Sequence, residues 1–190
     1  MNTEFEIKFL GIDTSEIKTK LLRIWFECIC EEYIMIRKTF HKQNPSPGEW
    51  FRVRKEKNKT TMTYKNISEN SIDWVSEIEI EVSDLSKTAE ILVLAWLNNT
   101  STQENKREIW SRKNVEICFD TWPWLKTYIE IEGDSAEAVK TVSEELGLDF
   151  SQWVFGWSES VYEIELWIPK SFLVDSLHTI PISPQANAPD

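Results

Sequence analysis

The first stretch that could do chemistry alternates charged and apolar residues near the start of the chain. In "EFEIKFL", residues 4–10, one parity holds Glu4, Glu6 and Lys8, and the other is apolar. Because a strand projects successive side chains to opposite faces, one face would carry two carboxylates and an ammonium. Taken alone, the pattern is also that of an ordinary strand with its charged face in water. Recurrence elsewhere in the chain separates the two interpretations.

The same charged parity recurs in later segments. "WFRVRKE" places Arg52 and Arg54 on one face, and "TTMTYK" adds Lys65. The remaining members of the set are acidic: Glu77 and Glu79 in "SEIEIEV", and Glu130 and Glu132 in "KTYIEIEG". Arginine and lysine pair with phosphate oxygens, while clustered carboxylates bind Mg²⁺ or Mn²⁺, which bridge phosphates. The mixture indicates a phosphorylated ligand held together with a divalent cation.

Helices and strands must position these side chains. The sequence predicts helices over residues 13–26 and 83–97, each with an acidic or hydroxyl cap and an apolar stripe. The strands expected around them span residues 4–10, 31–40, 50–56 and 60–65, then 76–82, 105–111, 114–122 and 126–133. Both halves of the chain therefore follow the order strand, helix, three strands.

Matching intervals support an internal repeat. The interval from Glu6 to Arg37 is 31 positions, and that from Glu77 to Arg107 is 30. Such agreement favours two copies of a βαβββ unit over two unrelated halves.

The chain after the repeat is less regular. A third helix is expected over residues 135–148, with Gly147 near its C-terminal cap. "VYEIELWI", residues 161–168, is interpreted as one further strand. We expect a single domain over residues 1–174 and a flexible C-terminal tail over 175–190, which ends in "PISPQANAPD".

Three amphipathic helices need an apolar surface to cover. If they pack on the apolar faces of the strands, the charged faces point the opposite way. An open sheet would show these faces to water, whereas a barrel would gather them into a tunnel lined by both signs of charge. Because buried unpaired charge costs several kcal/mol per ion, such a tunnel would hold water or ions.

Composition limits the partners. The 190-residue chain has 32 acidic and 21 basic residues and a formal net charge of −11. A general binder of nucleic-acid polymers or anionic membranes needs a basic face, so both classes are disfavoured. No basic start followed by an apolar run resembles a signal peptide, and no apolar stretch approaches about 18 residues. We expect a cytoplasmic protein without a membrane partner.

Cysteine and tryptophan usage adds two expectations. Cys28, Cys30 and Cys118 form no disulfide framework and favour a reducing compartment. Cys28 and Cys30 lack the spacing of a zinc site, so we expect core packing. The ten tryptophans are expected in the core and against the helices, with one near a tunnel mouth able to stack on a nucleobase.

Five motifs in register resemble a known family. These are "EFEIK", "RVR", "TMTYK", "EIEIEVSD" and "DTWPWLKTYIEIEG", which together cover roughly residues 4–150. In order and spacing they resemble the CYTH superfamily of class IV adenylyl cyclases and triphosphate tunnel metalloenzymes. The resemblance implies an α+β fold with an eight-stranded antiparallel β-barrel, open as a tunnel that holds a triphosphate and divalent cations.

The resemblance also implies roles for individual residues. Metal ligands would be Glu4, Glu6, Glu130 and Glu132, and phosphate contacts would come from Lys8, Arg52, Arg54, Lys65 and Arg107. Glu77 and Glu79 would bind metal or orient bases and water, and Asp120 would serve a second metal or position the nucleophile. Arg112 and Lys113 are alternatives to Arg107, because the register of residues 106–114 is ambiguous. His41 and His178 receive no role.

The residues leave several functions open. Water attacking the terminal phosphorus would make the protein a triphosphatase, which we favour because hydrolysis needs no base pocket. A ribose 3′-hydroxyl attacking the α-phosphorus would release pyrophosphate and form cyclic AMP. A non-catalytic sensor of a phosphorylated metabolite or nucleotide is a third reading, and a ligand-free structural domain a fourth. The expected substrate is ATP or inorganic tripolyphosphate with Mg²⁺ or Mn²⁺, and a homodimer would be unsurprising.

Overall fold

The repeat predicted from the sequence is present in the fold. The computed structural model describes residues 2–46, 48–67, 75–156, 158–168 and 179–180. The first unit comprises β1 (Asn2–Phe9), α1 (Thr14–Arg23), β2 (Glu27–His41), β3 (Glu49–Lys55) and β4 (Thr60–Ile67). The second comprises β5 (Val75–Val82), α2 (Leu85–Leu94), β6 (Asn98–Arg112), β7 (Val115–Thr121) and β8 (Tyr128–Gly133). Two successive βαβββ units are thus confirmed.

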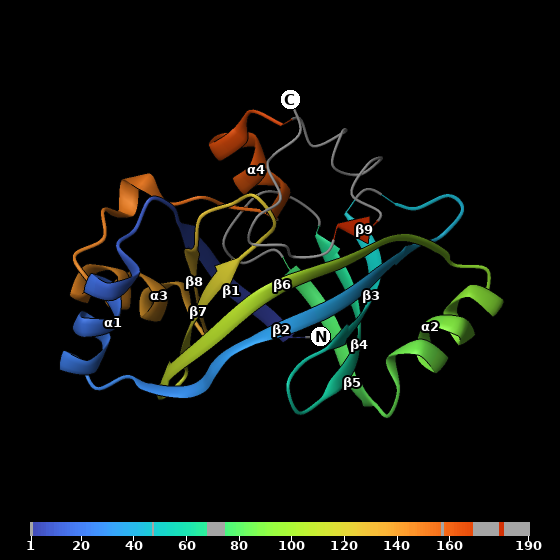
Figure 1. The fold of residues 1–190 in the computed structure, drawn as a ribbon, viewed down its shortest axis with the longest axis horizontal. Helices are drawn as coiled ribbons and strands as arrows, with labels where there is room; N and C mark the ends of the chain where they lie inside the picture. The colour runs from blue at the N-terminus through green and yellow to red at the C-terminus, as the bar shows by residue number, and fades with distance from the viewer. Residues whose placement is uncertain (1, 47, 68–74, 157, 169–178, 181–190) are drawn as a thin grey trace.

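The strands of the two units close on one another. In the described part of the chain they pair antiparallel in the order β2-β3-β4-β5-β1-β8-β7-β6, and β6 pairs back to β2. Each of the eight strands therefore has a partner on both sides, which confirms the α+β fold with an eight-stranded antiparallel barrel. Figure 1 shows α1 and α3 (Ala136–Glu145) packed beside one end of the curled sheet and α2 beside the other.

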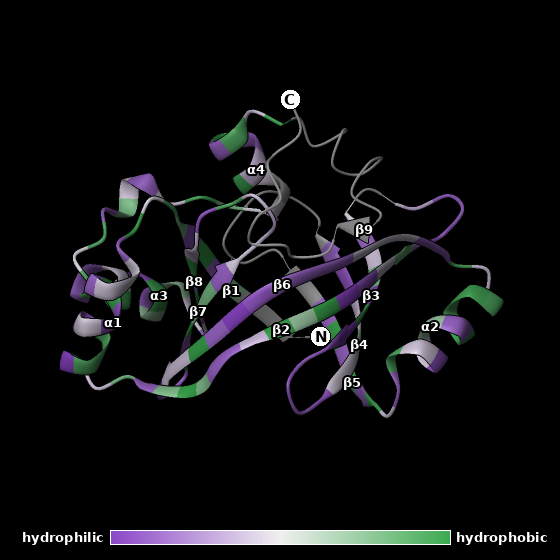
Figure 2. Ribbon diagram, in the orientation of Figure 1, coloured by the Kyte–Doolittle hydropathy of each residue, from purple (hydrophilic) through white to green (hydrophobic). Residues whose placement is uncertain are grey.

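Apolar side chains on the outer faces of the strands form the core with the helices. Beneath α1 and α3, the largest cluster includes Ile7, Ile117 and Ile131 from strands and Leu21 and Val139 from the helices. Each such side chain contributes about 1.5–3 kcal/mol when buried. Because side chains alternate along a strand, outward apolar residues force the charged parity inward. Figure 2 shows this alternation as hydrophobic and hydrophilic bands along the strands.

A smaller cluster attaches α2 to the other half of the barrel. Ala89 and Leu92 of this helix pack against Phe40 of β2 and Val53 of β3. The apolar residues thus cover the outside of the barrel in both halves, as the repeat requires.

Local signals set the ends of the helices. Asp13 accepts hydrogen bonds from the backbone N–H groups of Ser15 and Glu16, and Asp84 accepts one from Lys87. Two residues after the end of each helix a tryptophan lies in the left-handed region, Trp25 at φ 65° after α1 and Trp96 at φ 63° after α2. That conformation costs a residue other than glycine about 1–2 kcal/mol. Both indoles are more than 80% exposed, so core packing is wrong for these two tryptophans.

Strands β2 and β6 are longer than the segments expected at residues 31–40 and 105–111. Irregular pairing in β2 explains the missed start, because the register with β6 shifts between Cys28 and Cys30 and again between Cys30 and Tyr33. Each shift breaks the alternation on which a strand prediction depends. Core packing is also wrong for Cys28, which is exposed, and Cys30 is only partly buried.

The segment expected as a strand at residues 161–168 is mostly helical. α4 (Ser158–Leu166) buries Val161 and Tyr162 and packs Leu166 against the same cluster. These positions share one helical face, whereas a short apolar run such as "VYEIELWI" also fits a strand period. The prediction failed because its alternation was too short to distinguish the two.

The end of the chain is described only in part. Of the tail expected over residues 175–190, Thr179 and Ile180 form β9 (Thr179–Ile180), parallel to β6, and the rest lies outside the described residues. The single-domain boundary at residue 174 also lies outside them and stays a prediction. None of the helices in the described segments has the length and apolar character needed to cross a bilayer.

Candidate functional site

Charged side chains from all eight strands of the barrel line a common cavity of about 420 Å³. It gathers every site residue predicted from the sequence except Glu4, namely Glu6, Lys8, Arg52, Arg54, Lys65, Glu77, Glu79, Arg107, Asp120, Glu130 and Glu132. The backbone of Glu4 lies in β1 opposite Val75, and its side chain lies outside the described part of the structure. The charged parity therefore points into the barrel rather than into bulk water.

Lys8 is the most deeply buried ammonium of the site. It is 3% exposed, and its Nζ lies 2.7 Å from Glu130 Oε1 and 3.1 Å from Glu6 Oε1. Burial alone would lower the pKa of Lys8, but Glu130 and Glu6 outweigh it and raise that pKa. Lys8 therefore stays charged because two carboxylates face it inside the barrel.

Glu130 connects Lys8 to a second cation. Arg107 donates a hydrogen bond to Glu130 Oε2 at 2.8 Å, and its Nε donates to Asp120 Oδ1 at 2.7 Å. Burial would raise the pKa of Glu130, but Lys8 and Arg107 hold it well below its usual range. The network keeps Arg107 directed into the cavity, with Asp120 1% exposed behind it.

The pKa of Glu130 predicts how stability depends on pH. Since this pKa is lower in the folded chain than in the unfolded one, the stabilisation by Glu130 is present above about pH 5 and is lost as pH falls towards 2. We expect Glu130→Gln to lower the free energy of unfolding at pH 7 and to converge with the wild type at low pH. Urea unfolding from pH 7 to about 2 checks this, with the exposed Glu81→Gln as a control that keeps the wild-type slope.

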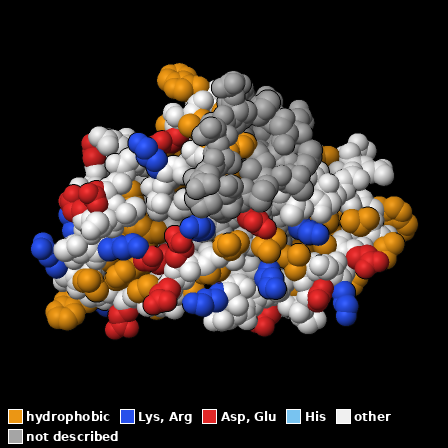
Figure 3. Space-filling model, viewed as in Figure 1, with side chains coloured by type: hydrophobic (Ala, Val, Ile, Leu, Met, Phe, Trp, Pro, Cys, Tyr) orange, Lys and Arg blue, Asp and Glu red, His pale blue; other side chains and the backbone are white. Residues whose placement is uncertain are grey.

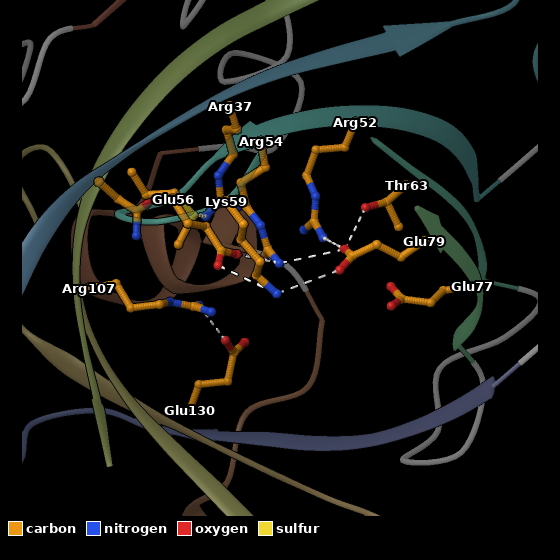
Figure 4. Close-up of polar contacts among 12 residues, drawn as sticks. Arg37, Arg52, Arg54, Glu56, Lys59, Thr63, Glu77, Glu79, Arg107 and Glu130 are labelled. Carbon is orange, nitrogen blue, oxygen red and sulfur yellow. Dashed lines mark hydrogen bonds and ion pairs between the residues drawn. The ribbon is translucent and has the colours of Figure 1, made fainter. Parts of the chain in front are cut away.

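Glu79 occupies the centre of a group of cations. Its Oε2 lies 3.8 Å from Arg52 Nη2 and 3.7 Å from Arg54 Nη2, and Thr63 donates a hydrogen bond to it at 2.8 Å. Lys59, from the turn between β3 and β4, approaches Glu79 Oε1 at 4.0 Å. Figure 4 shows these side chains converging inside the ring of strands. One carboxylate thus faces three cations at moderate distances.

Arg37 is a cavity residue that the sequence-based site list omitted. It lies opposite Arg54 in the β2–β3 pairing, donates to Asn105 Oδ1 at 2.9 Å, and covers the Trp122 ring at 4.5 Å. Burial, with Arg107 and Arg54 nearby, lowers the pKa of Arg37 to about 10. A signal for it existed, because the repeat aligns Arg37 with Arg107.

Three guanidinium groups in this cavity each have one nitrogen, Nε, without an acceptor among the described residues. The buried Nε atoms of Arg37, Arg52 and Arg54 have no hydrogen-bond partner among the described residues. Leaving a buried donor unsatisfied costs about 1–3 kcal/mol. Burial, together with Arg54 and Arg37, also lowers the pKa of Arg52 to about 9. The unliganded fold holds these charges at a cost that an oxyanion with several acceptor oxygens would relieve.

Carboxylates face one another at another part of the cavity. Glu132 of β8 lies directly opposite Glu6 of β1 on one side and Glu116 of β7 on the other. Like charges at such positions are unfavourable without a counter-ion. Their hard oxygen atoms have the chemistry that Mg²⁺ and Mn²⁺ prefer. Among the described side chains, no three acidic, cysteine or histidine groups are already close enough to hold a metal ion, so these would have to turn towards one.

A protein-family model matches most of the chain. The model of the CYTH domain matches residues 2–152, the part that forms the barrel. The chain belongs to the CYTH domain family. The resemblance stated from the sequence motifs is therefore confirmed. A search of curated proteins finds no match to this sequence.

Solved structures share the fold of this CYTH domain. A conserved hypothetical protein from Pyrococcus furiosus is 23% identical, with a TM-score of 0.66 over 80% of this chain and 94% of that one. An adenylate cyclase candidate from Vibrio parahaemolyticus is 11% identical, with a TM-score of 0.71 over 84% and 98%. An adenylyl cyclase candidate from Hippeastrum, reported to have a dominant triphosphatase activity, is 14% identical, with a TM-score of 0.56 over 90% and 99%. At these identities the likeness shows the fold alone.

Arg107 lines the cavity of the CYTH domain, whereas the two alternatives that the sequence offered, Arg112 and Lys113, do not. Arg112 donates to the carbonyl of Ile24 at 2.9 Å and to Glu145 at 2.6 Å, on the side of the barrel covered by helices. Lys113 lies in the turn after β6 at φ 57°. Neither residue lines the cavity. The register left ambiguous by the sequence is thereby resolved in favour of Arg107 as the cavity residue.

α4 packs where β7 turns towards β8. Tyr162 is buried beside Trp122 and Tyr128, and its hydroxyl donates to the carbonyl of Pro123 at 2.8 Å. Ser158, the first residue of α4, lines the cavity. This helix therefore holds Trp122, the ring that Arg37 covers, in place.

On the face of the molecule in Figure 3, the basic side chains of the described residues do not form a single patch. Lysine and arginine residues are scattered there among acidic and hydrophobic ones. The described part of that face therefore lacks the continuous basic stripe that a nucleic-acid polymer requires.

Proposed function

We propose that this CYTH domain is a divalent-metal-dependent enzyme that hydrolyses a triphosphate held inside the barrel. The observation that carries the proposal is the group of buried guanidinium Nε atoms of Arg37, Arg52 and Arg54, which have no acceptor in the described structure. A triphosphate offers many acceptor oxygens and the negative charge that these groups need. The carboxylates of the same cavity explain why the site would suit a metal–triphosphate complex better than a bare anion.

The basic residues would bind and orient the substrate. Arg52, Arg54 and Lys65 come from neighbouring strands and would contact phosphate oxygens from one wall. Lys65 now pairs with Glu77 at 3.0 Å, and Arg52 and Arg54 face Glu79, so phosphate oxygens would replace carboxylates as partners. Positioning and charge stabilisation of this kind provide most of the catalysis in phosphoryl transfer.

The acidic residues would supply the remaining functions. Glu6 and Glu132, with Glu4 and Glu130, would hold Mg²⁺ or Mn²⁺, which when bound neutralises phosphate charge. Glu77, Glu79 or Asp120 would orient a water molecule towards the terminal phosphorus. The oxygen of this water forms the new P–O bond, the bridging P–O bond breaks, and the carboxylate accepts the proton that the water loses. Orthophosphate and a diphosphate product leave.

Cyclisation is the second candidate for the same cavity. The Vibrio parahaemolyticus neighbour is described as an adenylate cyclase candidate, which favours this alternative. The dominant triphosphatase activity reported for the Hippeastrum neighbour favours hydrolysis. Hydrolysis needs only residues that bind phosphate and a carboxylate that orients water, and side chains of both kinds line the cavity.

The experiment that tests the proposal incubates the full chain with ATP or inorganic tripolyphosphate and either metal, and resolves the products by ³¹P NMR. Metal-dependent orthophosphate supports hydrolysis. Pyrophosphate with a cyclic nucleotide would establish the cyclase instead. Tight binding of either compound without turnover would leave a sensor, and absence of both turnover and binding would overturn the proposal.

Metal dependence predicts the behaviour of a carboxylate variant. We expect Glu6→Gln/Glu132→Gln to raise the Mg²⁺ or Mn²⁺ concentration at half-maximal rate about tenfold, because two hard ligands are lost. Titration of the hydrolysis rate with each metal measures this. Glu81→Gln is the matched control, because Glu81 follows Glu79 on the same parity of β5 yet is exposed and does not line the cavity. An equal shift in both variants would contradict the assignment.

Binding of the anion alone predicts a change in thermal stability. The buried Nε atoms of Arg37, Arg52 and Arg54 have no acceptor among the described residues, so tripolyphosphate should raise the Tm even without metal. At 100 times its Kd, a ligand stabilises by about 2.7 kcal/mol, which corresponds to roughly 5–10 °C for a chain of this size. Thermal melting with and without tripolyphosphate in EDTA tests this, and sulfate at the same ionic strength is the control for general salt effects.

A further inference from the structure

One wall of the charged cavity is apolar, and two irregularities in β2 produce it. Cys28 pairs with Trp110, Cys30 pairs with Ile109, and Tyr33 pairs with Arg107. β2 therefore advances five residues while β6 advances three, which leaves extra residues in β2. Such bulges redirect side chains and are common beside active sites.

Ile29, the residue between the first two pairs, lines the cavity as a result. Ile109 lines it from β6, and Cys118 of β7 lies directly opposite Ile109. Neighbouring strands β2, β6 and β7 thus contribute Ile29, Ile109 and Cys118 to the lining of the cavity, and we term these three residues the apolar wall. Ile29 and Ile109 are the only aliphatic side chains among the described residues that line this cavity.

The apolar wall extends from the interior to solvent. Cys118 is 3% exposed, whereas Ile29 is 56% exposed. An exposed isoleucine at the opening of a charged cavity leaves apolar area in water that a ligand could cover, at about 25 cal/mol per Å². A bare polyphosphate has no apolar surface to place there, so this part of the cavity does not suit an inorganic substrate.

Charged residues border the apolar wall on both sides. Arg107 lies two residues before Ile109 on the same face of β6, so the phosphate-binding part of the cavity continues directly into the wall. Glu116 lies two residues before Cys118 on the same face of β7 and also lines the cavity. A carboxylate beside an apolar surface can accept hydrogen bonds from an amino group on a flat ring.

We propose that the apolar wall of Ile29, Ile109 and Cys118 binds the amino-bearing base of a nucleoside triphosphate, with Glu116 accepting from the amino group. This inference rests on the proposed function, since the triphosphate would occupy the adjoining arginines. It names the substrate class as a nucleotide with an exocyclic amine, of which ATP is the probe. The wall contacts the part of the substrate that does not react, so its role is in affinity and specificity.

The test compares ATP with inorganic tripolyphosphate on the full chain, by calorimetric binding without turnover and by KM with metal. We expect Ile29→Ala/Ile109→Ala to weaken ATP binding roughly tenfold, while tripolyphosphate changes by less than about twofold. Ile34→Ala is the matched control, because Ile34 is also on β2 and 55% exposed but does not line the cavity. Glu116→Gln should weaken ATP more than inosine triphosphate, which lacks the amino group.

Each outcome decides between the two proposals. Wild-type binding of tripolyphosphate without binding of ATP would overturn the apolar wall as a base site and leave the proposed function intact. Equal weakening of both ligands in the double variant would also overturn it, because the wall would then act on the cavity as a whole. Failure of the wild type to bind either ligand would overturn the proposed function together with this inference.

Discussion

Replacing Lys8 by methionine is expected to abolish triphosphate hydrolysis and to lower the free energy of unfolding by about 3–5 kcal/mol. The effect on stability arises because Glu130 loses the ammonium 2.7 Å away and Glu6 loses its partner at 3.1 Å. Glu130 would keep Arg107 as its remaining partner, but one buried cation would then serve both Glu130 and Asp120. The effect on activity follows from the loss of an ammonium that would contact phosphate oxygens inside the cavity.

Urea unfolding and the hydrolysis rate measure the two effects separately. Lys18→Met is the matched control, because Lys18 pairs with Glu108 at 2.7 Å but is 37% exposed. Exposed pairs contribute about 0–1 kcal/mol, so this control should be mildly destabilised and fully active. Lys8→Met/Glu130→Gln should recover part of the lost stability and none of the activity. A Lys8→Met protein as stable as the control would mean that the cavity charges are solvated.

The charged parity predicted which side chains share a face, and the resemblance to the CYTH superfamily predicted that the sheet closes into a barrel. In "EFEIKFL" and "EIEIEV", strict alternation fixes which side chains share a face, and outward apolar residues then require the charges to point inward. Capping residues located the first two helices. The matching intervals of the repeat aligned Arg37 with Arg107. Placement of Lys8, Arg52 and Lys65 on one face of the sheet therefore followed from local pattern, whereas their placement inside a tunnel followed from the resemblance.

Three features could not be predicted, for different physical reasons. Ile29 enters the cavity because the β2 register shifts, and a bulge depends on pairing between strands that are far apart in sequence. α4 was missed because its run is too short to separate helical from strand periodicity. Trp25 and Trp96 terminate helices in a conformation usually occupied by glycine, so their hydrophobicity wrongly suggested burial.

Replacing Arg37 by methionine is expected to weaken triphosphate binding about 100-fold while leaving the free energy of unfolding within about 1 kcal/mol of the wild type. Charge-assisted hydrogen bonds contribute roughly 1.5–3 kcal/mol each, and 1.4 kcal/mol is a factor of ten in binding. Stability is spared because the unliganded fold gains little from this charge. Arg107 and Arg54 repel it, its Nε has no acceptor among the described residues, and burial holds its pKa near 10.

The favourable contacts of Arg37 are modest by comparison. It covers the Trp122 ring at 4.5 Å, a contact worth about 0.5–1 kcal/mol, and methionine can fill part of that space against the ring. The change also removes the hydrogen bond from Arg37 to Asn105 Oδ1 at 2.9 Å, while Asn105 still donates to Asp120 at 3.1 Å. Losses of this size are balanced by relief of the repulsion between buried cations.

Arg112→Met supplies the opposite control, since this arginine binds the Ile24 carbonyl and Glu145 outside the cavity. It should lose about 1 kcal/mol of stability with unchanged binding of tripolyphosphate. Calorimetry and urea unfolding on both variants give a crossed pattern: binding falls in one protein and stability falls in the other. A structural role for Arg37 would instead lower both quantities together. The crossed pattern would mean that this buried cation is held for an anionic ligand at the expense of the empty fold.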